Sequence, residues 1–261
     1  MFDLQVSRIQ FGTNNTRDSE LFSDQPVDDW TKNHNYFNDF DDYFGPVAPG
    51  TTGGFTLSGA GAAITQPNVD GGIISINAAA STATSLQKQG HFMIKAGLRT
   101  FFRQLVSIDN VLGLVLAGLT NVTATPFTGG QLTDGVWFSS TNAGVLSINV
   151  AVAGVVTTVA CGSTLIGGGF ATLGWYWDGA LYASAPNGRI VWEVAPPPFG
   201  VTSGITASAR GSILAPANFP GATLLAFLSG VNPSTAAARA LQIDYWYGLK
   251  DRLNFTQTPP F

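Results

Sequence analysis

The strongest constraint on the fold of this chain is the way turn residues divide it after residue 55. Short runs rich in Val, Ile, Leu, Phe and Trp recur there, and Gly, Asn, Pro and Ser interrupt them about every 8–15 residues. No segment has the apolar spacing that marks a long amphipathic helix. The pattern therefore predicts an all-β protein built as a sandwich or a barrel.

The expected strands and turns follow from these runs. Asp-Gly and Asn-Gly pairs supply the positive φ that a tight hairpin turn requires, which predicts turns at 178–179 and 187–188, and Ala153-Gly154 suggests a third. The expected strands are Phe55–Ser58, Gly72–Asn77, His91–Leu98, Gln104–Ile108, Val111–Leu119, Gly135–Ser140, Val145–Ala153, Val155–Cys161, Ala171–Trp177, Ala180–Ser184, Arg189–Val194, Ile205–Ser212, Leu224–Ser229 and Leu241–Tyr247.

The segment 171–194 is predicted to form a three-strand meander. Partial alternation within it places Trp175 and Trp177 on one face and Tyr176 on the other. Because both faces carry aromatic residues, we expect a second sheet or another chain to cover at least one of them.

The ends of the chain have a different composition. More than half of the 16 acidic residues lie before Gly45, among asparagines and aromatic residues. We expect an extended arm or a lid there, with one short helix or turn around Trp30–Phe40 and a turn-rich linker at 45–54. The tail ends in Thr-Pro-Pro-Phe and is a second arm candidate, because proline cannot continue a sheet ladder. The predicted division is 1–50 for the arm and linker, 51–250 for the β-domain and 251–261 for the tail.

The aromatic residues of the two arms are the predicted interface residues. Aromatic side chains in a polar segment usually dock on the domain's own surface or on a neighbouring subunit. They are Trp30, Tyr36, Phe37, Phe40, Tyr43, Phe44, Phe255 and Phe261.

Composition excludes several classes of protein. Only 11% of the 261 residues are charged, against a usual ~25%, and the net charge of −4 argues against broad nucleic-acid binding. The single cysteine, Cys161, allows no intrachain disulfide. The first residues lack the apolar core of a secretory signal, and no apolar run is long enough to span a membrane, so we expect neither feature.

Five segments resemble the concanavalin A-like (laminin-G-type) jelly-roll proteins encoded in the structural gene clusters of tailed phages. They are HFMIKAGLRT (91–100), DNVLGLVLAGLT (109–120), DGVWFSST (134–141), TLGWYWDGALYASAPNGRIVWEV (172–194) and LLAFLSGVNPSTAAARALQIDYWYGLKDR (224–252). Their order matches over roughly 55–250. The resemblance implies a two-sheet antiparallel β-sandwich of jelly-roll type.

The resemblance also implies a component of the virion surface. The first hypothesis is a capsid decoration (cement) protein that bridges major capsid subunits, as a homo-oligomer for which we expect a trimer. The alternative is a tail-fibre or surface module that binds a host glycan. Fold alone does not fix function.

Clusters that could carry chemistry each have a plainer interpretation. Asp39, Asp41 and Asp42 lack the spacing of a calcium loop, the two histidines are far apart in sequence, and Cys161 has no evident activating base, so we predict no metal, no cofactor and no catalytic residue. The carboxylates of the β-domain lack glycosidase spacing, so no enzyme is expected. A group of aromatics could stack on sugars, although burial in the core or at a subunit interface is the favoured interpretation. They are Trp137, Trp175, Trp177, Trp192, Tyr245 and Trp246.

Overall fold

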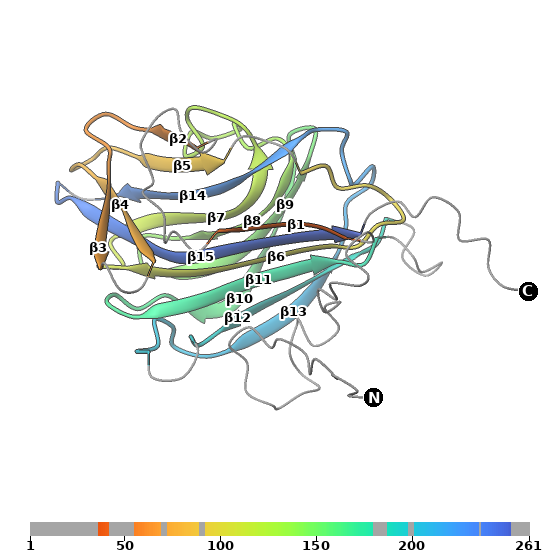
Figure 1. Ribbon diagram of the computed structural model, residues 1–261. Coiled ribbons are helices and arrows are strands. Elements are labelled where there is room, and N and C mark those ends of the chain that lie inside the picture. Colours follow the sequence, from red (N-terminus) through yellow and green to blue (C-terminus); the bar gives the residue numbers. More distant parts are fainter. Residues whose placement is uncertain are drawn as a thin grey trace, which may run out of the picture.

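Two antiparallel sheets packed face to face form the molecule (Figure 1). The computed structural model describes residues 36–41, 55–68, 72–88, 92–179, 187–197, 201–234 and 236–251. Over these residues the secondary structure is entirely β, as the turn-divided sequence predicts. None of the described segments forms an apolar helix of membrane-spanning length.

The first sheet has seven strands. In spatial order they are β10 (Val155–Thr164), β9 (Val145–Val152), β8 (Gly135–Ser140), β7 (Gly113–Asn121), β14 (Leu225–Pro233), β5 (Thr84–Lys88) and β2 (Phe55–Ser58).

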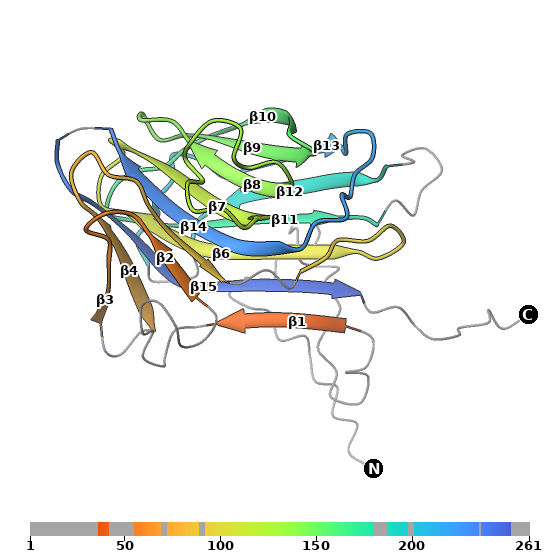
Figure 2. The ribbon, with the colours of Figure 1, turned by 90° about the horizontal axis from the view of Figure 1, so that it is seen from above.

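The second sheet has eight strands. Seven of them follow one another as β13 (Ala209–Leu214), β12 (Arg189–Ala195), β11 (Phe170–Trp177), β6 (Thr100–Ile108), β15 (Arg239–Asp251), β4 (Ile73–Ala78) and β3 (Ala63–Asn68). The eighth, β1 (Tyr36–Asp41), pairs with the second half of β15, and the two strands lie side by side in Figure 2.

The core lies between the sheets and is rich in aromatic rings. Trp175, Trp177 and Trp246 are at most 1% exposed. The ring of Phe227 from the first sheet stacks on Trp246 from the second, with centroids 4.7 Å apart. Gly248 makes this approach possible, because a Cβ there would lie 2.5 Å from the Phe227 ring. Burial of such large rings is the main source of stability in a sandwich.

Most expected strands are present, with shifted ends. Those at 55–58 and 135–140 have the predicted bounds. The predicted turn at Ala153-Gly154 is confirmed, because both residues have positive φ (49° and 82°) and join the paired strands β9 and β10. The faces predicted for Trp175 and Tyr176 are also confirmed, since the first is in the main core and the second packs outside it on Phe101.

Two expectations about strands are wrong. The predicted strand 91–98 forms only an isolated bridge, from Phe92 to Leu225, before a turn at Gly97 (φ 84°). The predicted meander fails because β11 pairs with β6 on one side and directly with β12 on the other, which leaves no place for a strand between them. Residues 180–184 lie outside the described ranges.

Three strands were not expected from the sequence. β3 and β5 are short and polar, with the sequences AITQPN and TSLQK. β1 falls within the predicted arm, where a helix or turn was expected; the chain is instead extended at 36–41. Asn and Asp compete for backbone hydrogen bonds and disfavour a helix interior, whereas β15 offers a ladder of backbone partners.

Candidate functional site

The outer face of the seven-stranded sheet carries its own small apolar cluster. Leu116, Trp137, Ala151 and Leu228 project from four adjacent strands, away from the main core. The loop between β7 and β8 folds over them and adds Leu132 and the half-buried ring of Phe127. This loop and the strands beneath it together form the candidate site.

Two glycines leave room for the two aromatic side chains of this cluster, Trp137 and Phe127. Gly118 is opposite Trp137 in the β7–β8 ladder, and a Cβ on Gly118 would lie only 2.5 Å from the Trp137 Cβ. A Cβ on Gly230 would lie 2.9 Å from the Phe127 ring. No real Cβ tolerates such distances, so both positions require glycine for the cluster to form.

A groove of about 320 Å³ opens between the loop and the sheet. This volume is at the lower end of the range for small-molecule sites. Its lining combines aromatic and aliphatic side chains with hydroxyl groups and loop backbone. The lining residues are Leu114, Leu116, Pro126, Phe127, Thr128, Gly129, Gly130, Leu132, Trp137, Ser139, Ser140 and Val156.

Three hydrogen-bonded polar side chains, on neighbouring strands β10, β9 and β8, form a row across the sheet beside the groove. Thr158 donates from Oγ1 to Asn149 Oδ1 (2.8 Å), and Asn149 donates from Nδ2 to Ser139 Oγ (2.9 Å). Asn149 is buried, so these two bonds hold its amide in one orientation. Ser139 accepts in this row, which leaves its own hydroxyl proton available to donate into the groove that it lines.

The loop is fastened at both ends. The side chain of Asn121 donates to Gln131 O (2.9 Å) and accepts from the backbone N–H groups of Thr133 (2.8 Å) and Asp134 (3.1 Å). At the other end, Gln87 pairs through its amide with both backbone groups of Thr123. The exposed tip at 128–130 therefore projects from a fixed base.

The strands beneath the groove are almost free of charge. The seven strands of this sheet carry a single charged residue, Lys88, and its ammonium group lies 5.3 Å from the Trp246 ring centroid, toward the core. No charged residue occurs in the chain between Asp134 and Asp178. The groove is therefore lined by neutral groups and holds no carboxylate.

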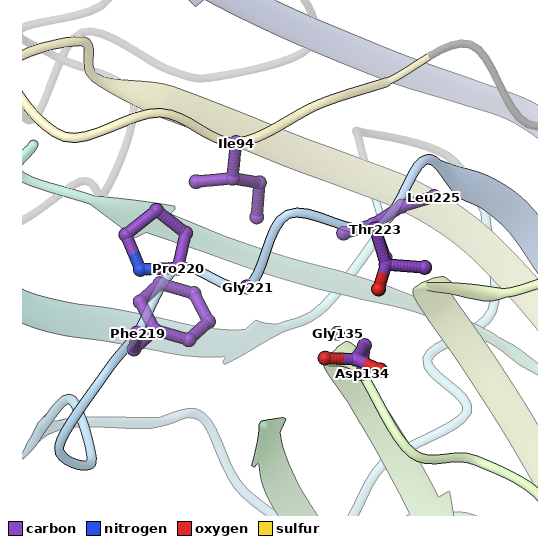
Figure 3. Close-up of a pocket in the computed structure, with 8 residues that line it drawn as sticks. All are labelled: Ile94, Asp134, Gly135, Phe219, Pro220, Gly221, Thr223 and Leu225. Atoms are coloured by element: carbon purple, nitrogen blue, oxygen red, sulfur yellow. The ribbon is translucent and has the colours of Figure 1, made fainter. Parts of the chain in front are cut away.

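A second hollow lies at one end of the sandwich, and Figure 3 shows the side chains around it. Its volume is about 10 Å³, which is room for about one water molecule. Asp134 on its wall accepts from Ala153 N (3.2 Å) and Thr133 Oγ1 (3.0 Å). Across from it, the Phe219-Pro220 bond is cis. The Asp134 carboxylate thus holds the β9–β10 turn, and the hollow is too small for an organic ligand.

Of the aromatics considered for sugar stacking, only Trp137 lines the groove. Trp175, Trp177 and Trp246 are core residues, as favoured, and Trp192 joins the same cluster with its ring over Gly211. Burial raises the pKa of Tyr245, which lies on β15 of the other sheet. Phe127 and Ser139 were not predicted from the sequence. The run PFTGG at 126–130 resembles an ordinary turn, and nothing in its local sequence indicates that it folds back over a strand.

The structure describes only some of the other predicted site residues. Tyr36, Phe37 and Phe40 lie on β1, whose backbone alone is described. Trp30, Tyr43, Phe44, Phe255 and Phe261 lie outside the described residues, as do Asp42 and both histidines, His34 and His91. Their interface role stays a prediction.

Cys161 lies near the end of β10. It is buried in the main core, and burial raises the pKa of its thiol to about 12. The thiolate that a nucleophile requires is therefore absent near neutral pH.

Comparison with known proteins identifies the architecture. No family model matches, and no curated protein matches. Among solved structures, the winged bean acidic lectin in complex with methyl-α-D-galactose has a TM-score of 0.55 and 11% identity, over 83% of this chain and 98% of that one. Lectin II from Ulex europaeus gives 0.54 and 11%, over 83% and 99%.

The fold is a lectin-like jelly roll. A protein of unknown function from Shewanella oneidensis MR-1 shares it, with a TM-score of 0.51 and 14% identity over 87% of this chain and 90% of that one. The predicted two-sheet concanavalin A-like sandwich is confirmed. Identities this low establish the fold alone.

Proposed function

We propose that this protein is a carbohydrate-binding module and that the groove over Trp137 receives a neutral sugar. The observation that carries the proposal is the groove itself, in which aromatic surface lies beside hydroxyl and backbone groups with no charge. A sugar ring has an apolar face and a rim of hydroxyl groups. Such a ligand needs an aromatic wall for the first and uncharged hydrogen-bonding groups for the second.

The parts of the groove have separate roles in this proposal. Phe127, together with the small exposed part of Trp137, supplies apolar surface to one face of the ring. Ser139 donates a hydrogen bond, and the exposed backbone at Gly129 and Gly130 offers donors and acceptors that the fixed loop base preorganises. The lectin neighbours support the proposal by analogy of fold, since the winged bean lectin is in complex with a galactoside.

The proposed activity is binding without catalysis. Glycoside hydrolysis uses two carboxylates that flank the sugar, and the residues that line the groove include none. Capsid decoration, with a major capsid protein as partner, a trimeric state and a location on the virion, stays a prediction from the sequence resemblance, because no observation tests it.

The test is binding to an array of neutral glycans, followed by calorimetric titration of the strongest ligand. Phe127→Ala removes half-buried aromatic surface from the wall, and we expect it to weaken binding about tenfold, the effect of losing ~1.4 kcal/mol at an interface anchor. Ser139→Ala removes the proposed donor and should weaken binding about fivefold.

The matched control is Val122→Ala. Val122 is exposed on the same loop but does not line the groove, so its replacement should leave affinity unchanged. The proposal is wrong if the folded protein binds no neutral glycan. It is equally wrong if Phe127→Ala and Ser139→Ala bind as well as the Val122→Ala control.

A further inference from the structure

The seven-stranded sheet ends in an open edge at β10. This strand pairs with β9 on one side. On its other side the last residue, Thr164, exchanges hydrogen bonds with Thr206, whereas no strand of the described chain lies beside Val155 to Ala160. Val155 and Val156 at its start are 68% and 44% exposed. An exposed strand edge is a template for pairing with another chain.

The β10 edge lacks the usual protection. Proteins block sheet edges with charged residues, prolines, bulges or very short strands. Elsewhere in this molecule, β13 carries Arg210, β3 contains Pro67 beside a register shift, and β2 has only four residues. From Val155 to Ala160, β10 is regular and has neither charge nor proline, and its register shift begins only after Ala160.

The turn geometry determines which backbone groups face outward. Residues of an antiparallel strand alternate between pairs that are hydrogen-bonded to the neighbour and pairs that are not. The two-residue turn at 153–154 makes Val152 and Val155 a hydrogen-bonded pair. By alternation, Val156, Thr158 and Ala160 direct their N–H and C=O groups away from β9.

The distribution of charge favours a second copy of this chain as the partner of the β10 edge. The net charge of the chain is −4, so most surfaces of two copies repel each other weakly. No charged residue lies between Asp134 and Asp178, a stretch that includes β8 to β11. The β10 edge is therefore a place where a second copy can approach without juxtaposing like charges.

We propose that two copies of this protein pair antiparallel through β10 about a two-fold axis. Thr158 then faces Thr158 of the second copy, and Val156 faces Ala160. The outward backbone groups of all three residues pair across the axis, and the two seven-stranded sheets become one. A two-fold interface must be self-complementary, and this neutral strand of small and β-branched residues meets that requirement.

The pairing would bring the two grooves close to one another. Val156 lines the groove and also belongs to the edge, so both grooves would lie on the joined outer faces. A dimer of this kind would bind a repetitive glycan through two sites, with a gain in avidity. This last consequence rests on the proposed function, whereas the pairing itself does not.

The experiment is sedimentation velocity of the full chain over a range of concentrations, without any glycan. We expect the mass to rise from monomer to dimer. Thr158→Lys places two ammonium groups opposite each other at the axis and should abolish the dimer. Thr158→Val also loses the hydroxyl bond to Asn149 but adds no charge, so it should retain the dimer. Ser212→Lys, on exposed β13 of the other sheet, should likewise retain it.

A disulfide experiment tests the register. The facing Thr158 pair would have Cα atoms about 5.5 Å apart, which suits a disulfide bond. Thr158→Cys should therefore give a covalent dimer on oxidation, whereas Ser212→Cys should not, and Cys161 is buried. A monomer up to millimolar concentration, a dimer that survives Thr158→Lys, or no disulfide-linked dimer of Thr158→Cys would overturn the proposal. Because no glycan is present, failure of the pairing leaves the groove proposal intact.

Discussion

At the residue scale, the absence of a side chain at Gly118 allows Trp137 to occupy the floor of the groove. The two residues are opposite each other in the β7–β8 ladder. A Cβ on Gly118 would meet the carbonyl oxygen of Val136 at 2.4 Å and the Trp137 Cα at 2.5 Å. Neither neighbour can move without breaking the ladder, because both contacts involve backbone atoms.

We therefore expect Gly118→Ala to destabilise the protein by about 2–3 kcal/mol, the upper part of the range for overpacking a tight site. Urea unfolding followed by tryptophan fluorescence measures the change. Gly129→Ala is the matched control, since a Cβ there meets nothing within 4 Å, and it should change stability by less than about 0.5 kcal/mol. Equal stability of the two variants would contradict this account of the groove floor.

At the element scale, the strands are the part of the fold that local sequence predicts best. β2 and β8 have the predicted bounds because apolar runs flanked by turn residues encode them locally. β5 is polar and becomes a strand only because β14 and β2 lie beside it, so its identity depends on tertiary pairing. The groove depends in the same way on the β7–β8 loop. Trp137 was a candidate from the sequence. Only the sheet order shows that it belongs to the cluster on the outer face and not to the main core with the other tryptophans that the structure describes.

The loop is expected to lose its fixed position when Asn121 is replaced. Asn121→Ala removes three hydrogen bonds to Gln131, Thr133 and Asp134, and leaves two backbone N–H groups without that acceptor. We expect a loss of about 1–3 kcal/mol in stability and faster exchange of the amides at 133 and 134. Hydrogen–deuterium exchange measures this directly. Thr125→Ala, an exposed change in the same loop, should leave the exchange unaltered; protection that persists in Asn121→Ala would contradict the anchoring role.

At the scale of the whole molecule, the two outer faces differ in charge. The eight-stranded sheet places Glu193 of β12 opposite Arg210 of β13 and carries Arg103 on β6, two strands from β12. The strands of the seven-stranded sheet carry only Lys88, which lies against core rings. This asymmetry supports both proposals, because a neutral groove suits a neutral ligand and a neutral edge suits a second copy.

The same asymmetry predicts that the proposed glycan binding is insensitive to salt. Screening weakens interactions between charges, and no charged residue lines the groove. We expect the affinity for the best neutral glycan to change less than about twofold between about 0.05 M and 0.5 M NaCl in calorimetric titrations. A sulfated form of the same glycan should bind more weakly, because its charge would be desolvated without a partner. An affinity that falls steeply with salt, or a preference for the sulfated form, would place the binding site on a charged surface away from Trp137.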